Sequence, residues 1–169
     1  MEDRWNTIND LRNAVEELQL KGLTNSSGTV LFGGSFGANL ALAVGSQLND
    51  SVALTLASAP PIDLSSDNFG NGITNYFSLS PEFESPPPEH QVILAAYSDD
   101  QIVPEEEVRL WYEFITSEGG NAQFLEFSDL PHRWRGRDDP RGVAVERELL
   151  NRIYRELLPT SDCGFINSE

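Results

Sequence analysis

The sequence predicts an α/β protein in which a mostly parallel sheet is covered by helices on both faces. Four short apolar segments alternate along the chain with segments of helical periodicity. The apolar segments are almost continuously hydrophobic, which is typical of parallel strands buried on both faces, because strands with one solvated face alternate apolar and polar residues. We therefore expect a three-layer sandwich with its reactive groups in the loops at the carboxyl ends of the strands.

Each expected strand is a short apolar run that ends at glycine, proline or polar residues. The four runs are residues 29–32, 52–57, 92–96 and 122–127. The last run is the least hydrophobic, which favours a place near an edge of the sheet. Residues 62–89 are rich in serine, asparagine, glycine and proline, which predicts a long connection with one short helical turn near 73–77. We interpret this connection as the remnant of a lid.

Apolar residues recur at helical spacing in four further segments. Helices are expected over residues 6–20, from Phe36 to 48, from Pro104 to 118, and over residues 142–158. Pro104 and the three glutamates after it suit the first turn of a helix, where a missing N–H does no harm and negative charge is favourable. The expected apolar faces are Ile8, Leu11, Val15 and Leu18 in the first helix, and Leu149, Leu150, Ile153, Tyr154 and Leu157 in the last.

The chain is strongly acidic, with 27 aspartates and glutamates against 11 lysines and arginines, and a formal net charge of −16 over 169 residues. Such a surface repels nucleic acid and anionic membranes, and no segment has the length and hydrophobicity of a membrane span. Cys163 is the single cysteine, and no apolar leader lies within residues 1–10; both observations favour the cytoplasm without assigning it. Neither a repeat nor a linker divides residues 1–169, so a single domain is expected.

The first expected strand leads into Gly33-Gly34-Ser35-Phe36-Gly37, a G-x-S-x-G run followed by a helix. This is the context of a nucleophile elbow, a strained turn that projects a serine hydroxyl above the sheet, with flanking glycines where side chains would collide. The start of the helix places the Phe36 N–H and the positive end of the helix dipole where they stabilise an oxyanion. The alternative is a tight glycine turn with an exposed serine.

Phosphate-binding loops do not fit the glycines at this turn. A dinucleotide-binding loop that began at Gly33 would need glycine where Ser35 and Ala38 stand, and the Gly37-Ala38-Asn39 ending is not that of a Walker loop.

A serine nucleophile needs a base, and the chain contains only two histidines. His90 precedes the third strand and is expected at the amino end of the sheet, whereas His132 follows the fourth strand and is expected on the same side as Ser35. The acid that orients the histidine is expected after another strand, where Asp99 and Asp100 follow the third strand and Asp63 follows the second. Each of these side chains also suits an ordinary surface or turn role.

The chain order of Ser35, Asp100 and His132 resembles that of the α/β-hydrolase superfamily, whose triads run serine, acid, histidine. Esterases, thioesterases and prolyl-oligopeptidase-like enzymes of this superfamily carry an acid-x-x-Val-Pro pattern before a helix. Aligning Val103-Pro104 with that pattern selects Asp100, with Asp99 as the alternative. Two departures are Ala38, where a second glycine often follows the elbow, and Pro131, where glycine commonly precedes the histidine.

The resemblance implies a serine hydrolase that needs neither a metal nor an organic cofactor. Its expected substrate is a small carboxylic ester or thioester, and a prolyl-oligopeptidase-like peptidase is the alternative. A third interpretation is an inactive chain of the same fold that acts as a binding module. Trp134, close after His132, is a candidate for a substrate pocket, although the charged run around it also suits a solvated loop.

The resemblance covers only the second half of the family's usual domain. Members carry several more strands before the elbow, together with an HGGG-type motif that supplies a second oxyanion donor, and no such motif precedes Gly33. We therefore expect an N-terminally truncated hydrolase, with a minimal enzyme and a non-catalytic module as the alternatives. If the remainder of the domain is absent, the first strand is expected to expose an apolar sheet edge through which chains associate.

Overall fold

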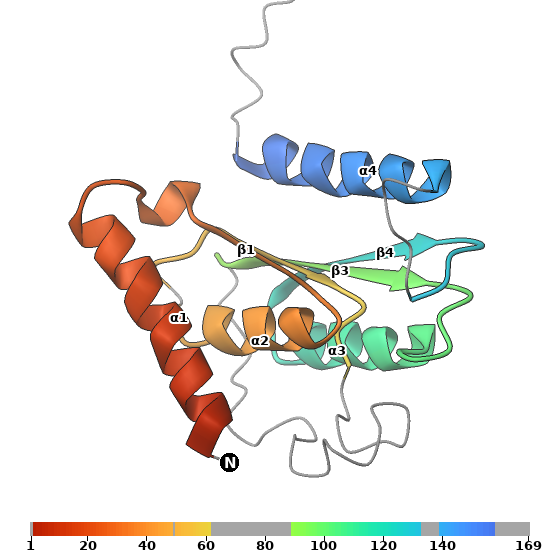
Figure 1. Cartoon of the computed structure of the whole chain (residues 1–169), viewed down its shortest axis with the longest axis horizontal. Coiled ribbons are helices and arrows are strands. Elements are labelled where there is room, and N and C mark those ends of the chain that lie inside the picture. The colour runs from red at the N-terminus through yellow and green to blue at the C-terminus, as the bar shows by residue number, and fades with distance from the viewer. Residues whose placement is uncertain (1, 49, 62–88, 133–138, 158–169) are drawn as a thin grey trace, which may run out of the picture.

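The computed structural model describes residues 2–48, 50–61, 89–132 and 139–157, with side chains from residue 6 onward. The fold class predicted from the sequence is confirmed. Four strands form one sheet in their order along the chain, and every neighbouring pair is parallel (Figure 1). The strands are β1 (Val30–Gly34), β2 (Leu54–Ser58), β3 (Gln91–Tyr97) and β4 (Asn121–Phe127).

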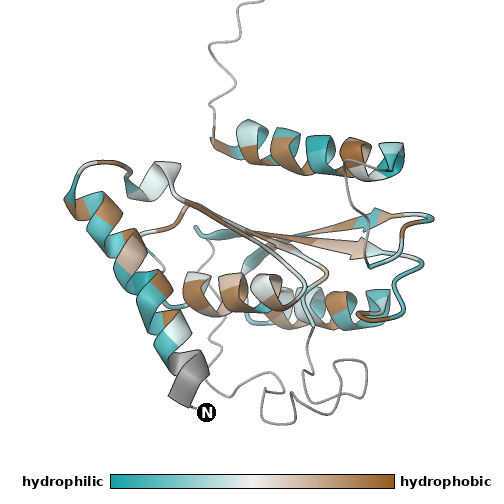
Figure 2. Ribbon diagram, in the orientation of Figure 1, coloured by the Kyte–Doolittle hydropathy of each residue, from teal (hydrophilic) through white to brown (hydrophobic). Residues whose placement is uncertain are grey.

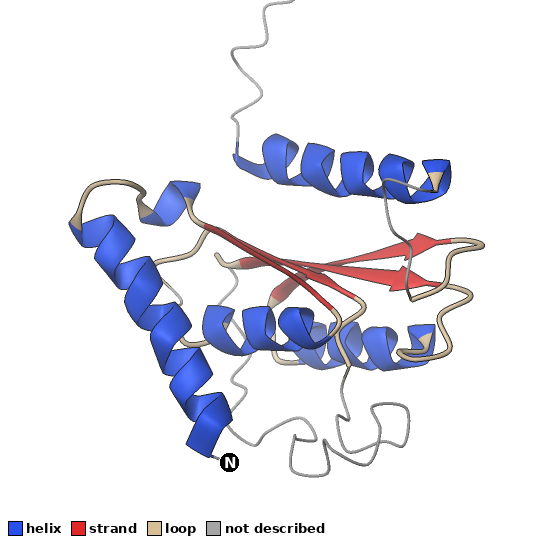
Figure 3. Cartoon of the chain, viewed as in Figure 1, coloured by secondary structure: helices blue, strands red, loops and turns tan. Residues whose placement is uncertain are grey.

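Helices cover both faces of this sheet, which gives three layers. The helices are α1 (Glu2–Leu20), α2 (Phe36–Gly45), α3 (Glu105–Ser117) and α4 (Pro140–Leu157), with a short 3₁₀ turn η1 (Ser26–Gly28) before β1. Helix α4 lies on one face, helices α2 and α3 lie on the other, and α1 packs beside α2 (Figures 1 and 3). The strands β2 and β3, in the middle of the sheet, are buried almost throughout.

The hydrophobic core joins the sheet to α2 and α3 below and to α4 above. Trp111 and Ile115 of α3 and Leu42 of α2 are buried against one face, and Val145 and Leu149 of α4 are buried against the other. In Figure 2 the strands and α2 are mostly brown, whereas α1, α3 and α4 alternate between brown and teal. This difference follows from burial, because α2 is enclosed by its neighbours and the other helices keep one solvated face.

Two expected positions on α1 are exposed rather than buried. Ile8 and Val15 pack against α2, but Leu11 and Leu18 remain more than two-fifths exposed. They line a groove together with Leu31 and Phe32 of β1, the strand that pairs only with β2 in the described sheet. Phe32 of β1 is likewise 56% exposed, and this groove of about 320 Å³ runs between α1, β1 and α2. Association of chains through this edge stays a prediction.

The buried face of α4 is narrower than expected. Val145 and Leu149 are buried and Ile153 packs against the core, whereas Leu150 and Tyr154 are at least half exposed. Consecutive residues on a helix differ by about 100° in direction, so a helix that lies flat on a sheet through one line of residues turns the next ones outward.

The strands β1, β2 and β3 extend further toward their carboxyl ends than the apolar runs do, whereas β4 ends where its run ends. Gly33 and Gly34 belong to β1 because they continue its register opposite Ala57 and Ser58 of β2. Pro104 lies immediately before α3 rather than within it.

The turn expected near 73–77 and the lid role of residues 62–89 fall on a stretch of which only Glu89 is described. No helix in the described ranges is long and apolar enough to cross a membrane.

His90 is buried at the amino end of β3, at the opposite end of the sheet from Ser35. Its Nε2 lies 2.8 Å from Thr55 Oγ1, and its Nδ1 has no hydrogen-bond partner in the described part of the chain. The ring also packs against Gly45 of α2, where an added Cβ would lie 3.3 Å from it. Burial disfavours the charged imidazolium and lowers the pKa of His90 to about 4.

The lowered pKa predicts acid sensitivity that His90→Gln removes. The unfolded chain binds a proton at this histidine near pH 6.5, whereas the folded chain resists protonation down to about pH 4. The contribution of this histidine to stability is therefore complete above pH 6.5 and falls by roughly 3 kcal/mol as the pH drops toward 4. Urea unfolding from pH 7.5 to 4 measures this slope. An equal slope in wild type and His90→Gln would contradict the assignment.

Candidate active site

Three of the loops that leave the carboxyl end of the parallel sheet carry the residues singled out in the sequence. Ser35 follows β1, Asp100 follows β3 and His132 follows β4. Because all strand pairs are parallel, these loops emerge on the same side of the sheet (Figure 3). Residues that lie 97 positions apart in the sequence are thus brought into hydrogen-bond contact.

Ser35 lies in a strained turn between β1 and α2. Its backbone adopts φ 53° and ψ −124°, a conformation that side chains other than glycine rarely adopt. Its N–H donates to Ser58 O of β2 at 2.8 Å, and its carbonyl accepts from Ala38 and Asn39 in the first turn of α2. Hydrogen bonds to a strand on one side and to a helix on the other therefore keep the backbone of Ser35 in its strained conformation.

Of the two predicted elbow glycines, only Gly33 lies where there is no room for a side chain. A Cβ on Gly33 would overlap the carbonyl of Gly37 and lie 2.7 Å from Ala38 N. Gly37 itself has open space around the position of a Cβ, within the described residues. The expectation that both glycines avoid a collision is therefore wrong for Gly37, since that residue lies inside α2 with its Cβ direction outward.

His132 lies between Ser35 and Asp100 and is within hydrogen-bond distance of both. Its Nε2 is 2.8 Å from Ser35 Oγ, and its Nδ1 is 2.6 Å from Asp100 Oδ2. The histidine side chain is 12% exposed, and that of Asp100 is fully buried. A carboxylate that is hydrogen-bonded to Nδ1 favours the histidine tautomer in which Nδ1 carries the proton and Nε2 accepts from the serine hydroxyl.

Asp100, rather than Asp99, contacts the histidine. Asp100 Oδ1 accepts the backbone N–H groups of Ile102 and Val103, each at 2.9 Å, which leaves Oδ2 for His132. Asp99 is exposed, and its backbone N–H donates to Leu130 O in residues 128–132, the described part of the loop after β4, here called the His132 loop. Two backbone donors fix the Asp100 carboxylate in one orientation.

Phe36 is the first residue of α2 and directly follows Ser35. Its side chain is 40% exposed, and its backbone N–H belongs to the first turn of the helix, where the helix dipole is positive. The position is suited to stabilising negative charge on an oxygen of a carbonyl carbon that is attacked by Ser35 Oγ.

Sequence reasoning missed the residues that support this arrangement. Ser58 holds Ser35 through its carbonyl, and its own hydroxyl lies 2.5 Å from the buried Tyr97 hydroxyl. Ser98 Oγ accepts the N–H of Asp129 in the loop that leads to His132. The sequence signal for them is weak, namely that small polar residues end β2 and follow β3 directly.

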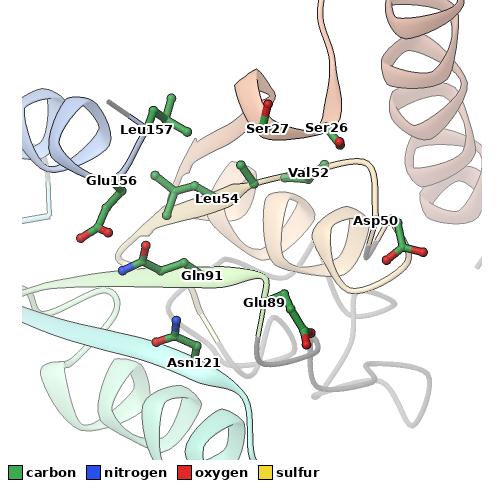
Figure 4. A pocket seen from close by; sticks show the side chains of 11 residues that line it. Ser26, Ser27, Asp50, Val52, Leu54, Glu89, Gln91, Asn121, Glu156 and Leu157 are labelled. Atoms are coloured by element: carbon green, nitrogen blue, oxygen red, sulfur yellow. The ribbon is translucent and has the colours of Figure 1, made fainter. Parts of the chain in front are cut away.

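The other candidates from the sequence lie away from this site or outside the described residues. His90 lies at the amino end of β3, and both Trp134 and Asp63 fall outside the described residues. A separate hollow of about 530 Å³ opens at the amino ends of the strands and includes the carboxylates of Asp50, Glu89 and Glu156 (Figure 4). In the described ranges no three metal-binding side chains gather into a potential metal site.

Comparisons with known proteins connect this geometry to a fold. No family model matches the chain, and no curated protein matches it by sequence. The chain superposes on Arabidopsis thaliana SOBER1 with a TM-score of 0.64 and 15% identity, over 89% of this chain and 64% of that one. It superposes on a post-proline cleaving enzyme from Rickettsia typhi with a TM-score of 0.71 and 21% identity, over 89% of this chain and 24% of that one.

Esterase PE8 superposes with a TM-score of 0.57 and 19% identity, over 86% of this chain and 61% of that one. The chain thus spans less than two thirds of the length of each of these three proteins. All three are members of the α/β-hydrolase superfamily, so the fold predicted from the serine, acid, histidine order is confirmed. This chain has the α/β-hydrolase fold over the part of the domain that it contains.

The two elbow glycines give a matched pair of substitutions. Gly33→Ala is expected to destabilise the fold by at least about 2 kcal/mol, because its methyl group would overlap backbone atoms that cannot move without displacing α2. Gly37→Ala is expected to leave stability unchanged or raise it by up to about 1 kcal/mol, since alanine favours a helix and meets open space. Chemical unfolding of both variants measures the difference. Equal stability of the two would contradict the close approach at Gly33.

Proposed function

We propose that this protein is a serine hydrolase that cleaves a carboxylic ester or thioester through an acyl-enzyme on Ser35. The observation that carries the proposal is the connected pair of hydrogen bonds, Ser35 Oγ to His132 Nε2 at 2.8 Å and His132 Nδ1 to Asp100 Oδ2 at 2.6 Å. A nucleophile in contact with a base, itself oriented by a buried carboxylate, is the arrangement that acyl transfer to water needs.

In the first half of the proposed reaction, Ser35 Oγ attacks the substrate carbonyl carbon while its proton passes to His132 Nε2. The carbonyl oxygen becomes an oxyanion, and the backbone N–H of Phe36 donates to it. Asp100 stabilises the imidazolium that has formed without taking its proton. His132 then returns the proton to the leaving alcohol or thiol, the bond to that group breaks, and the acyl group stays on Ser35.

In the second half, a water molecule replaces the leaving group. His132 Nε2 takes a proton from this water, whose oxygen attacks the acyl carbon. The second oxyanion collapses, the proton returns from His132 to Ser35 Oγ, and the carboxylic acid is released. The strained backbone of Ser35 favours both steps because it holds the hydroxyl at the helix start throughout.

A peptide bond is the second candidate substrate. The fold is also that of a post-proline cleaving enzyme, which makes a peptide bond the alternative to an ester. Esters remain the lead, since an alkoxide or thiolate leaves more readily than an amine and demands less of the acid step. A panel of p-nitrophenyl esters and proline p-nitroanilides separates the two substrate classes.

Covalent labelling by a fluorophosphonate tests whether Ser35 is activated. The folded wild-type protein is expected to be labelled, and Ser35→Ala is expected to be inert, because the probe reacts with serines whose base is in place. Circular dichroism on both proteins provides the control for folding. A folded wild type that takes up no label would overturn the proposal and favour a non-catalytic binding module.

Adjacent aspartates provide a matched control for the acid. Asp100→Asn is expected to slow labelling roughly 10³- to 10⁴-fold, because the amide permits the wrong histidine tautomer. Asp99→Asn removes the same charge one residue away and is expected to change the rate less than about threefold, because its side chain is exposed. Labelling rates for the two variants, compared at one pH and salt concentration, decide the matter. A larger loss in Asp99→Asn would reverse the assignment.

A further inference from the structure

We propose that Arg141 and Ser98 are positioning residues that hold the His132 loop from two sides and so set the distance from His132 to Ser35. This inference rests on the proposed function for its catalytic meaning. Arg141 lies in the first turn of α4, and Ser98 directly follows β3, so neither belongs to the loop they hold.

The turn at Asp129 is the feature that needs support. Asp129 lies three residues before His132 and adopts φ 59°, in the left-handed region that residues other than glycine rarely occupy. The next residue, Leu130, is buried in the core at 2% exposure. The turn therefore directs one side chain into the core and places the histidine two residues later above the sheet.

Both backbone groups of Asp129 are bonded to residues outside the loop. Its N–H donates to Ser98 Oγ at 2.9 Å, and its carbonyl accepts from Arg141 Nη1 at 2.8 Å. A further bond, from Asp99 N–H to Leu130 O at 3.2 Å, ties the same loop to the segment that carries Asp100. The acid and the base are thus held in one hydrogen-bonded unit, which preserves their mutual distance.

Arg141 is itself fixed by Asp139. Its Nε and Nη2 donate to the two carboxylate oxygens of Asp139, and the same carboxylate accepts the Arg141 backbone N–H at the start of α4. The Arg141 hydrogen bond holds the pKa of Asp139 below its usual value. A guanidinium held by a two-point contact keeps its remaining Nη1 donor aimed at Asp129 O, which a lysine ammonium does less well.

The arrangement links α4 to the catalytic base. Val145 and Leu149 pack helix α4 against the sheet. The hydrogen bond from Arg141 therefore ties the exposed turn at Asp129 to a helix whose position is fixed. Displacement of a reacting group by about 1 Å costs up to roughly 100-fold in rate. Loss of either contact to Asp129 is therefore expected to affect the chemistry more than the fold.

The first test compares Arg141→Gln with Arg152→Gln. Arg152 pairs with Glu148 on the same helix and makes no hydrogen bond or ion pair with the described residues 128–132, so its loss removes equal charge and a similar surface pair. Arg141→Gln is expected to slow fluorophosphonate labelling roughly 10- to 100-fold relative to Arg152→Gln. Ser98→Ala, which removes the other contact, is expected to slow it in the same direction. Labelling of both variants at the Arg152→Gln rate would overturn the proposal.

The second test does not depend on catalysis. The ring ¹⁵N chemical shifts of His132 report the hydrogen bond from its Nδ1 to Asp100. They are expected to move toward those of a solvated imidazole in Arg141→Gln and Ser98→Ala, and to stay at wild-type values in Arg152→Gln. Unchanged shifts in both variants would overturn the positioning role. If the wild type is not labelled, the proposed function fails, while these shifts still decide whether the loop is held as inferred.

Discussion

The strained turn at Ser35 is the constraint on which the candidate site depends. The backbone turns sharply there because Gly33, lacking a Cβ, lies against the carbonyl of Gly37, and because Ser58 O accepts the Ser35 N–H. If the turn relaxed, the hydroxyl would leave His132 and the start of α2 together. The parallel pairing of β1 with β2 and the packing of α2 under the sheet therefore both maintain the backbone conformation of Ser35.

Backbone strain is concentrated at the same end of the sheet. Within the described ranges, the non-glycine residues with positive φ are Ser35, Ala59 and Asp129, and each lies at or just beyond the carboxyl end of a strand. Strained residues persist only where surrounding contacts hold them, and they gather at functional sites. Ser35 and Asp129 are held by hydrogen bonds to neighbouring strands, loops and α4, so the sheet and helices support the loops that carry the proposed catalytic residues.

Much of the fold could be predicted from the sequence because burial leaves a local pattern. Continuous apolar runs indicated parallel strands, and the G-x-S-x-G run between a strand and a helix indicated the turn at Ser35. Once the strands are parallel, the loops after them meet at one edge, so Ser35, Asp100 and His132 were predicted to lie together, as the structure has them.

The remaining details depend on contacts that have no signature along the chain. Asp99 and Asp100 differ by one position, and only the backbone donors of Ile102 and Val103 distinguish them. Periodicity placed Leu150 and Tyr154 inward because it cannot measure how wide a face a helix buries. The hydrogen bond from Arg141 to Asp129 joins a helix to a loop 12 positions earlier in the chain, and no sequence pattern indicates such a contact.

The central claim is that Ser35 becomes acylated, and trapping the acyl-enzyme tests it most directly. The folded protein is mixed with p-nitrophenyl acetate, quenched in acid within seconds, digested and mapped by mass spectrometry. The account predicts one acetyl group on the peptide that contains Ser35. Acetylation at another residue, or a folded protein that acquires no acetyl group above the level of Ser35→Ala, would contradict it.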